Sequence, residues 1–128
     1  MSTEQNKATI RHWVEGMNTR NVTMLEALVD ELYSANFVVH NDPQPAAAIG
    51  REGVKQFVRT TLKNTPDMQL TIRELLAEED RAASRLTMSG TDALTGQPAR
   101  LLITQIWRFA GGQVAELWQA AIPVGGQP

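Results

Sequence analysis

The chain has 128 residues, 42% of them hydrophobic and 20% charged, which is the size and balance of one soluble domain with a single core. A formal net charge of -2, with no cluster of Lys and Arg, disfavours a nucleic-acid partner. The start is unlike a signal peptide, no apolar run approaches the ~20 residues of a membrane span, and Cys is absent. The sequence therefore predicts a cytoplasmic protein, with no metal site because His12 and His40 are the only imidazoles.

The N-terminal half carries three amphipathic patterns. Residues 3–17, 24–33 and 54–62 repeat apolar side chains at intervals of three and four, which predicts three helices. Ser2 or Thr3 can cap the first helix. Between the second and third helices, the β-branched and aromatic run 35–40 predicts a short strand that ends in turn residues.

The pattern changes to a period of two after Pro66. Residues 68–73 and 85–89 alternate around a charged turn, which predicts antiparallel neighbours. The stretch from Leu101 to Trp118 predicts a hairpin that turns at Gly111-Gly112. Helices followed by a meander indicate one α+β domain over residues 1–128, with the helices packed on one face of a curved sheet.

Gln105 interrupts one face of this hairpin. Its four neighbours on the same alternation, Leu101, Ile103, Trp107 and Phe109, are apolar, and Val114, Trp118 and Ala120 resume the period beyond the turn. A carboxamide there must find partners or lose about 1–3 kcal/mol. Gln105 is therefore either the floor of a pocket or a satisfied core polar group. The opposite face would carry Leu102, Ile106 and Leu117, which predicts an apolar surface that a second subunit covers.

Several short strings occur in a characteristic order along nearly the whole chain. They are residues 13–18, 37–40, 50–54, 66–68, 77–81, 90–91, 106–109 and 116–118. This series resembles the SnoaL-like polyketide cyclases of the nuclear transport factor 2-like, or ketosteroid isomerase-like, superfamily. The resemblance implies a cone-shaped α+β barrel: three N-terminal helices packed on a strongly curved antiparallel sheet that encloses an apolar pocket. It also implies a homodimer formed through the outer face of the sheet.

The cyclases use a pocket carboxylate that removes a carbon-bound proton and sets up an aldol closure. In the family this Asp usually follows the Glu of the last strand by six residues, and the sixth residue after Glu116 is Ile122. No carboxylate follows Glu116 in this chain. Either the base lies elsewhere or the family reaction is lost. Glu116 itself is predicted to be an ion-pair partner of Arg108 or Arg85.

The resemblance to the ketosteroid isomerases assigns other roles. It implies Gln105 as the hydrogen-bond donor on the sheet, Trp13 as the aromatic residue of the first helix, and a base among His40, Asn41 and Asp42. Each of these also has a structural interpretation. His40 can be a buried imidazole bonded to a backbone carbonyl, and the Asp42 carboxylate can serve the Asn-Asp-Pro turn.

Two functions follow. The first is a SnoaL-like enzyme without cofactor that cyclises, isomerises or dehydrates an apolar carbonyl compound, with His40 or Asp42 as base and Gln105 as donor. The second is a non-catalytic member that binds a small hydrophobic ligand or serves as a dimeric scaffold. In both, the predicted pocket is lined by Trp13, Tyr33, Phe37, Trp107, Trp118 and Ile122. The enzyme is favoured if His40 or Asp42 reaches a cavity that also exposes Gln105.

Overall fold

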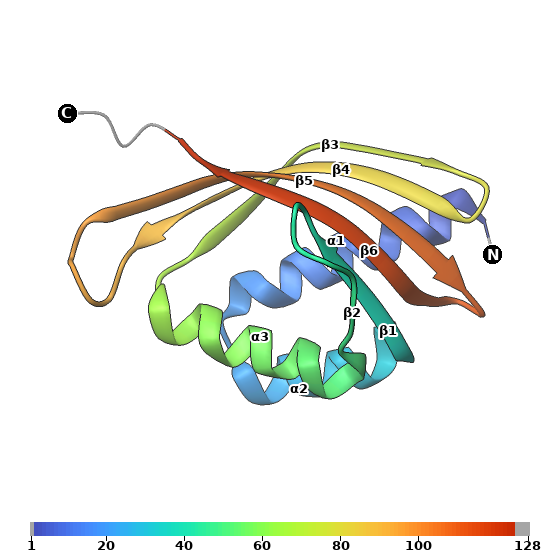
Figure 1. The fold of residues 1–128 in the computed structure, drawn as a ribbon, viewed down its shortest axis with the longest axis horizontal. Helices are drawn as coiled ribbons and strands as arrows, with labels where there is room; N and C mark the ends of the chain where they lie inside the picture. Colours follow the sequence, from blue (N-terminus) through green and yellow to red (C-terminus); the bar gives the residue numbers. More distant parts are fainter. Residues whose placement is uncertain (1, 125–128) are drawn as a thin grey trace.

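The computed structural model describes residues 2–124, and this part of the chain forms three helices and six strands (Figure 1). The helices are α1 (Thr3–Thr19), α2 (Val22–Leu32) and α3 (Gly50–Asn64). The strands are β1 (Tyr33–Asn41), β2 (Ala47–Ala48), β3 (Gln69–Glu78), β4 (Arg81–Thr91), β5 (Pro98–Ala110) and β6 (Gln113–Pro123). Within residues 2–124, no helix is both long and apolar enough to cross a membrane.

Side-chain caps explain where the first two helices begin. The Ser2 hydroxyl accepts a hydrogen bond from the Gln5 backbone N–H, and the Gln5 side chain accepts one from the Ser2 N–H. This reciprocal pair satisfies two backbone donors that a helix start leaves free. The Asn21 side chain caps α2 in the same sense by accepting from the Met24 N–H. The predicted helix starts thus have a local physical cause.

The sheet has the strand order β2-β1-β6-β5-β4-β3. β3, β4, β5 and β6 form the predicted antiparallel meander, and β1 pairs with β6 in parallel. The sheet is therefore mixed, whereas the resemblance implied an antiparallel one. The meander starts with β3 at the edge of the sheet farthest from β1. The chain then reverses three times, so that β6 lies beside β1 and runs in the same direction as β1. The predicted α+β architecture, with three helices on a curved sheet, is confirmed, although the sheet stays open.

The helices lie together on the concave side of the sheet (Figure 1). α1 packs on β3, and α3 packs on α2 and β1. Completely or almost completely buried side chains fill the space between the two layers, among them Ile10, Leu25, Val29, Val58 and Trp107. Burial of such apolar area is the main favourable contribution to folding.

A β-bulge near the turn of the β5–β6 hairpin decides which side chains of β6 face the helices. Phe109 pairs with Val114, whereas Arg108 pairs with Glu116, so Ala115 is an extra residue on β6. Such an insertion reverses the alternation beyond it. As a result Trp107 pairs with Leu117 on the inner face. The prediction that Leu117 faces outward and Trp118 inward is therefore wrong.

Candidate functional site

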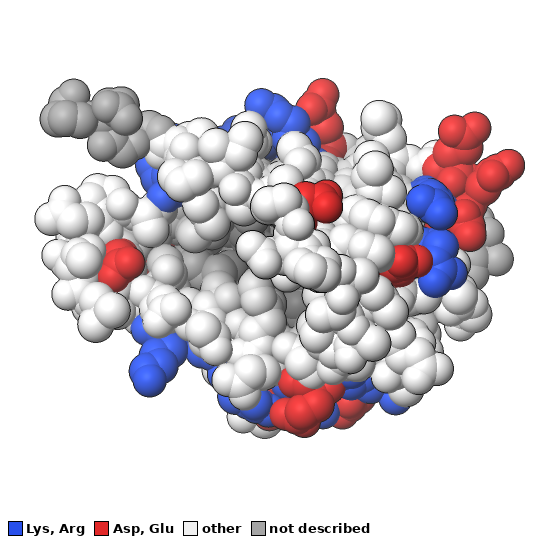
Figure 2. Space-filling model, viewed as in Figure 1, with Lys and Arg blue, Asp and Glu red and all other residues white. Residues whose placement is uncertain are grey.

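A cavity of about 210 Å³ lies between the helices and the inner face of the sheet. Figure 2 shows this face of the molecule hollowed, with mainly uncharged side chains around the opening. The helical side of the cavity is lined by Trp13, Met17, Ile49, Val54, Phe57 and Thr61, with Met68 following α3. The sheet side is lined by Tyr33, Phe37, Val39, Asn41, Leu70, Leu86, Met88, Leu101, Ile103, Gln105, Trp107, Leu117 and Gln119.

Aromatic side chains form one end of this cavity. The Trp13 and Tyr33 rings meet edge to face with centroids 5.1 Å apart, and the Tyr33 and Phe37 rings do so at 5.0 Å. Edge-to-face packing of this kind stabilises an aromatic cluster beyond its burial alone. The structure thus places Trp13, Tyr33, Phe37 and Trp107 at the cavity, where the sequence put them. Their contact with a ligand stays a prediction.

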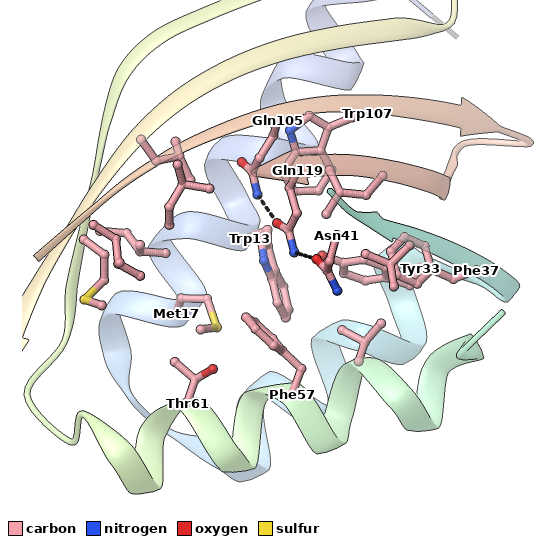
Figure 3. A pocket seen from close by; sticks show the side chains of 18 of the residues that line it. Trp13, Met17, Tyr33, Phe37, Asn41, Phe57, Thr61, Gln105, Trp107 and Gln119 are labelled. Carbon is pink, nitrogen blue, oxygen red and sulfur yellow. Dashed lines mark hydrogen bonds between the residues drawn. The ribbon is translucent and has the colours of Figure 1, made fainter. Parts of the chain in front are cut away.

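A row of hydrogen-bonded polar side chains runs along the sheet wall of the cavity, and Figure 3 shows three of its members, Gln105, Gln119 and Asn41. Ser84, Gln105, Gln119 and Asn41 are register partners on β4, β5, β6 and β1, so their side chains stand side by side on the inner face. The Ser84 hydroxyl donates to Gln105 Oε1 (2.8 Å), and Gln105 Nε2 donates to Gln119 Oε1 (3.1 Å). Gln119 Nε2 then donates to Asn41 Oδ1 (2.6 Å). We call these four residues the amide row.

The buried end of the amide row is held by a tryptophan. The indole N–H of Trp107 donates to the Ser84 hydroxyl at 2.9 Å, and both side chains are buried. The other end, Asn41, is exposed and therefore lies at the rim of the cavity. Gln105 is thus both a member of the cavity wall and a satisfied polar group, so the two interpretations of this residue hold together.

Proton-transfer groups are scarce in the cavity wall. Within residues 2–124, the lining side chains include no carboxylate, imidazole, ammonium or guanidinium group. Tyr33 is the one lining residue with an ionisable side chain, and burial raises the pKa of its phenol far above the ordinary value. The described residues also contain no group of three or more His, Asp or Glu side chains that could hold a metal ion. The wall is therefore neutral at pH 7.

His40 lies on the opposite face of the sheet from the cavity. Its Nε2 donates to Glu116 Oε2 at 2.6 Å, and Arg108 Nε donates to Glu116 Oε1 at 2.9 Å. The hydrogen bond from His40 and the contact with Arg108 hold the pKa of Glu116 below its ordinary value. The imidazole also stacks on Trp118 with centroids 4.7 Å apart. His40 is therefore not placed to act on a molecule in the cavity, and the predicted Glu116–Arg108 ion pair is present.

Asp42, the other predicted base, and Ile122, at the position of the catalytic Asp in the cyclases, also lie outside the cavity wall. Asp42 is exposed in the loop after β1. Ile122 is 58% exposed and pairs with Leu102, and Trp118 pairs with Ile106, both on the outer face. Neither Trp118 nor Ile122 is a lining residue: the bulge at Ala115 reverses the alternation that predicted Trp118 to face inward, and Ile122, which the resemblance placed at the catalytic position of the family, lies on the same outer face.

Three members of the amide row, Ser84, Gln119 and Asn41, were not predicted to lie together beside the cavity. Ser84 sits in an alternating strand without a distinguishing neighbour, and Asn41 was considered only as part of a loop that carries a base. Gln119 follows Leu117 by two residues, so both side chains face the same side of β6. Because of the bulge, this is the inner face, where Gln105 also lies. The sequence does contain one sign of the row, namely two Gln residues on neighbouring strands. Recognising them as partners requires the register of the two strands to be known.

Comparison with known proteins identifies the fold and the family. Residues 10–117 match the family model of the SnoaL-like domain. The structure of AclR from Streptomyces galilaeus, a proposed hydroxylase, is 25% identical in sequence, with a TM-score of 0.79. The match covers 94% of this chain and 91% of the AclR chain. A proposed SnoaL-like polyketide cyclase from Jannaschia sp. CCS1 is 17% identical, with a TM-score of 0.82. The match covers 93% of this chain and 86% of the cyclase. IdmH from Streptomyces antibioticus, a proposed polyketide cyclase, is 23% identical with a TM-score of 0.73, covering 89% of each chain. No curated protein sequence matches the chain.

Proposed function

Because the chain belongs to the SnoaL-like domain family, we propose that its cavity binds a small, mostly apolar molecule, which the wall holds and orients without removing a proton from it. One observation carries this proposal. Within residues 2–124, the lining side chains are apolar or neutral, and the three lining amides, Gln105, Gln119 and Asn41, are already bonded to one another in the amide row. An apolar pocket with a few converging polar groups is the usual form of a small-molecule site.

The size of the cavity limits the ligand. A volume of about 210 Å³ lies below the ~300–1,000 Å³ of sites for drug-sized ligands, so a compound of two or three rings is the appropriate class. Burying about 150 Å² of apolar ligand surface contributes about 4 kcal/mol at ~25 cal/mol per Å². A gain of this size corresponds to a dissociation constant of about 1 mM, and association has its own entropic cost, so we expect millimolar dissociation constants.

A cavity-blocking variant tests this proposal. Thr61 lines the cavity from α3, whereas Thr60 is exposed and does not line it. Titration of naphthalene-sized probes, followed by the fluorescence of Trp13 and Trp107, should show saturable binding to the wild type. Thr61→Trp should abolish this binding by filling the space, and Thr60→Trp should preserve it. Equal binding by the two variants would place the probe elsewhere and remove the support for the proposal.

Cofactor-free proton transfer is the second candidate function. It is supported by the polyketide cyclases among the structural neighbours and by Gln105, whose amide can donate to a developing oxyanion from the cavity wall. It is the weaker candidate because neither His40 nor Asp42 is a lining residue. Hydrogen–deuterium exchange at the carbon next to the carbonyl of 2-tetralone in D₂O separates the two functions. Binding alone predicts no acceleration, whereas the enzyme predicts an acceleration that Asp42→Asn or His40→Ala removes.

A homodimer and a cytoplasmic location remain predictions. The dimer is supported by three large apolar side chains, Leu76 (69% exposed), Ile106 (46%) and Ile122 (58%), which lie on the outer face of the sheet, away from the helices. Contiguous exposed apolar area on one face is typical of an interaction surface.

A further inference from the structure

The direction of the hydrogen bonds in the amide row can be determined from the chemistry of its members. The oxygen and nitrogen ends of a carboxamide have nearly the same size, so the bonding network decides which end points where. A row of amides alone could run in either direction. The row in this protein ends on an indole and a hydroxyl, whose hydrogen-bonding capacities differ.

Trp107 imposes the direction. An indole N–H can only donate, so the Ser84 oxygen must accept from it. Ser84 is 5% exposed, and its own hydroxyl proton therefore needs a protein acceptor. Gln105 Oε1 provides that acceptor at 2.8 Å. The Gln105 oxygen consequently faces Ser84, and its nitrogen must face the next strand.

The constraint passes along the row to the rim. Gln105 Nε2 donates to Gln119 Oε1, which turns the Gln119 nitrogen toward Asn41 Oδ1. Asn41 Nδ2 is then the free end, and Figure 3 shows it pointing away from Gln119. The opposite direction would leave the Asn41 oxygen free at the same place. The row therefore presents donors at the rim because of a tryptophan at its other end.

We infer that Trp107 and Ser84 act as positioning residues that make the cavity select ligands with a hydrogen-bond acceptor, namely a carbonyl oxygen bound to Asn41. This inference rests on the proposed binding function and adds the ligand class. A carbonyl satisfies the amide protons that the row leaves free, whereas a hydrocarbon of the same shape does not. One net hydrogen bond corresponds to an affinity difference of about threefold to tenfold.

A matched pair of probes measures this selectivity. 2-Acetylnaphthalene and 2-isopropenylnaphthalene have the same planar shape, and the ketone oxygen of the first is a CH₂ group in the second. The ratio of their association constants in the wild type is the reference. Asn41→Leu should lower this ratio about threefold to tenfold by removing the terminal donor, with the hydrocarbon still bound.

Gln105→Glu tests the direction itself. At pH 8 a carboxylate accepts from both Ser84 and Gln119, so Gln119 and Asn41 must turn round and leave an oxygen at the rim. The ketone-to-hydrocarbon ratio should then fall about threefold to tenfold. Thr104→Glu is the control for charge, because Thr104 precedes Gln105 on β5, lies on the outer face and is outside the row. An unchanged ratio in Gln105→Glu, or an equal fall in Thr104→Glu, would overturn the inference.

Nuclear Overhauser contacts read the direction without a ligand. The inferred direction predicts contacts from the Gln105 amide protons to Gln119, and none from them to the Trp107 indole proton. In Trp107→Phe the Gln105 amide protons should contact Ser84 as well as Gln119, whereas in Trp13→Phe, which alters a second lining tryptophan, they should contact Gln119 alone. Contacts between the Gln105 amide and the Trp107 indole in the wild type would refute the inference. If no probe binds the wild type, the binding proposal fails as well; if both probes bind and no variant changes their ratio, only the inference fails.

Discussion

Gln105→Leu is expected to destabilise the fold, although it places an apolar side chain on an apolar wall. Gln105 accepts a hydrogen bond from Ser84 and donates one to Gln119. With Leu at this position the buried Ser84 hydroxyl loses its acceptor, which costs about 1–3 kcal/mol. Gln119 lies nearer the rim and can bond to water instead. The added apolar burial offsets up to about 1 kcal/mol, because residue 105 is half-buried.

The net loss should be about 1–2 kcal/mol, or a fall in Tm of about 4–8 °C for a domain of this size. Urea unfolding at pH 7 measures the free energy directly, and Gln69→Leu is the control. Gln69 is an exposed residue of β3, so its replacement should change stability by less than about 0.5 kcal/mol. A Gln105→Leu protein as stable as the wild type would refute the idea that the amide row depends on this residue.

The outer face of the sheet allows three further tests. Bonding to His40 and Arg108 lowers the pKa of Glu116 in the folded protein. The Glu116 carboxylate therefore stabilises the fold at pH values above its pKa in the unfolded chain, which is ~4.3. This contribution is lost as the pH falls through the pKa of Glu116 in the folded protein. Glu116→Gln should therefore cost about 1–3 kcal/mol in urea unfolding at pH 7 and progressively less as the pH falls below ~4; a difference independent of pH would contradict the linkage. Added to Ile106→Asp, which should break the predicted dimer, Ile122→Asp should change stability by no more than about 0.5 kcal/mol in the same assay, because the side chain is 58% exposed; a larger loss in this monomeric background would contradict the β5–β6 register. Light scattering at micromolar concentration should give a dimer for the wild type and a monomer for Ile106→Asp, and a monomeric wild type would exclude the predicted interface.

Elements whose signal is local could be predicted from the sequence. The three helices repeat their apolar residues at helical intervals, and the cap at Ser2 lies within one turn of the residues it serves. Strands β3 and β4 follow a clear alternation, although both extend beyond the predicted ends. Tyr33 begins β1 rather than ending α2, because an aromatic residue at a helix–strand junction fits either pattern.

The parallel pairing of β1 with β6 had no comparable signal. It joins residues far apart in the chain, such as His40 and Trp118, and no periodicity within either strand specifies the partner. Gln105 could be recognised as unusual because its own strand is so regular. Its partners could not, since a lateral row across four strands exists only when every register between them is fixed.

One inserted residue decides which side chains of β6 face the cavity. Without the bulge at Ala115, Glu116 and Trp118 would face the helices, and Leu117 and Gln119 would face outward. With the bulge, the Glu116 side chain lies on the outer face, where its carboxylate pairs with both His40 and Arg108. The same shift carries Gln119 inward to connect Gln105 with Asn41. The bulge thus keeps the Glu116 carboxylate out of the inner wall, and the alternation of β1, with Phe37, Val39 and Asn41 at the cavity, keeps the His40 imidazole on the opposite face.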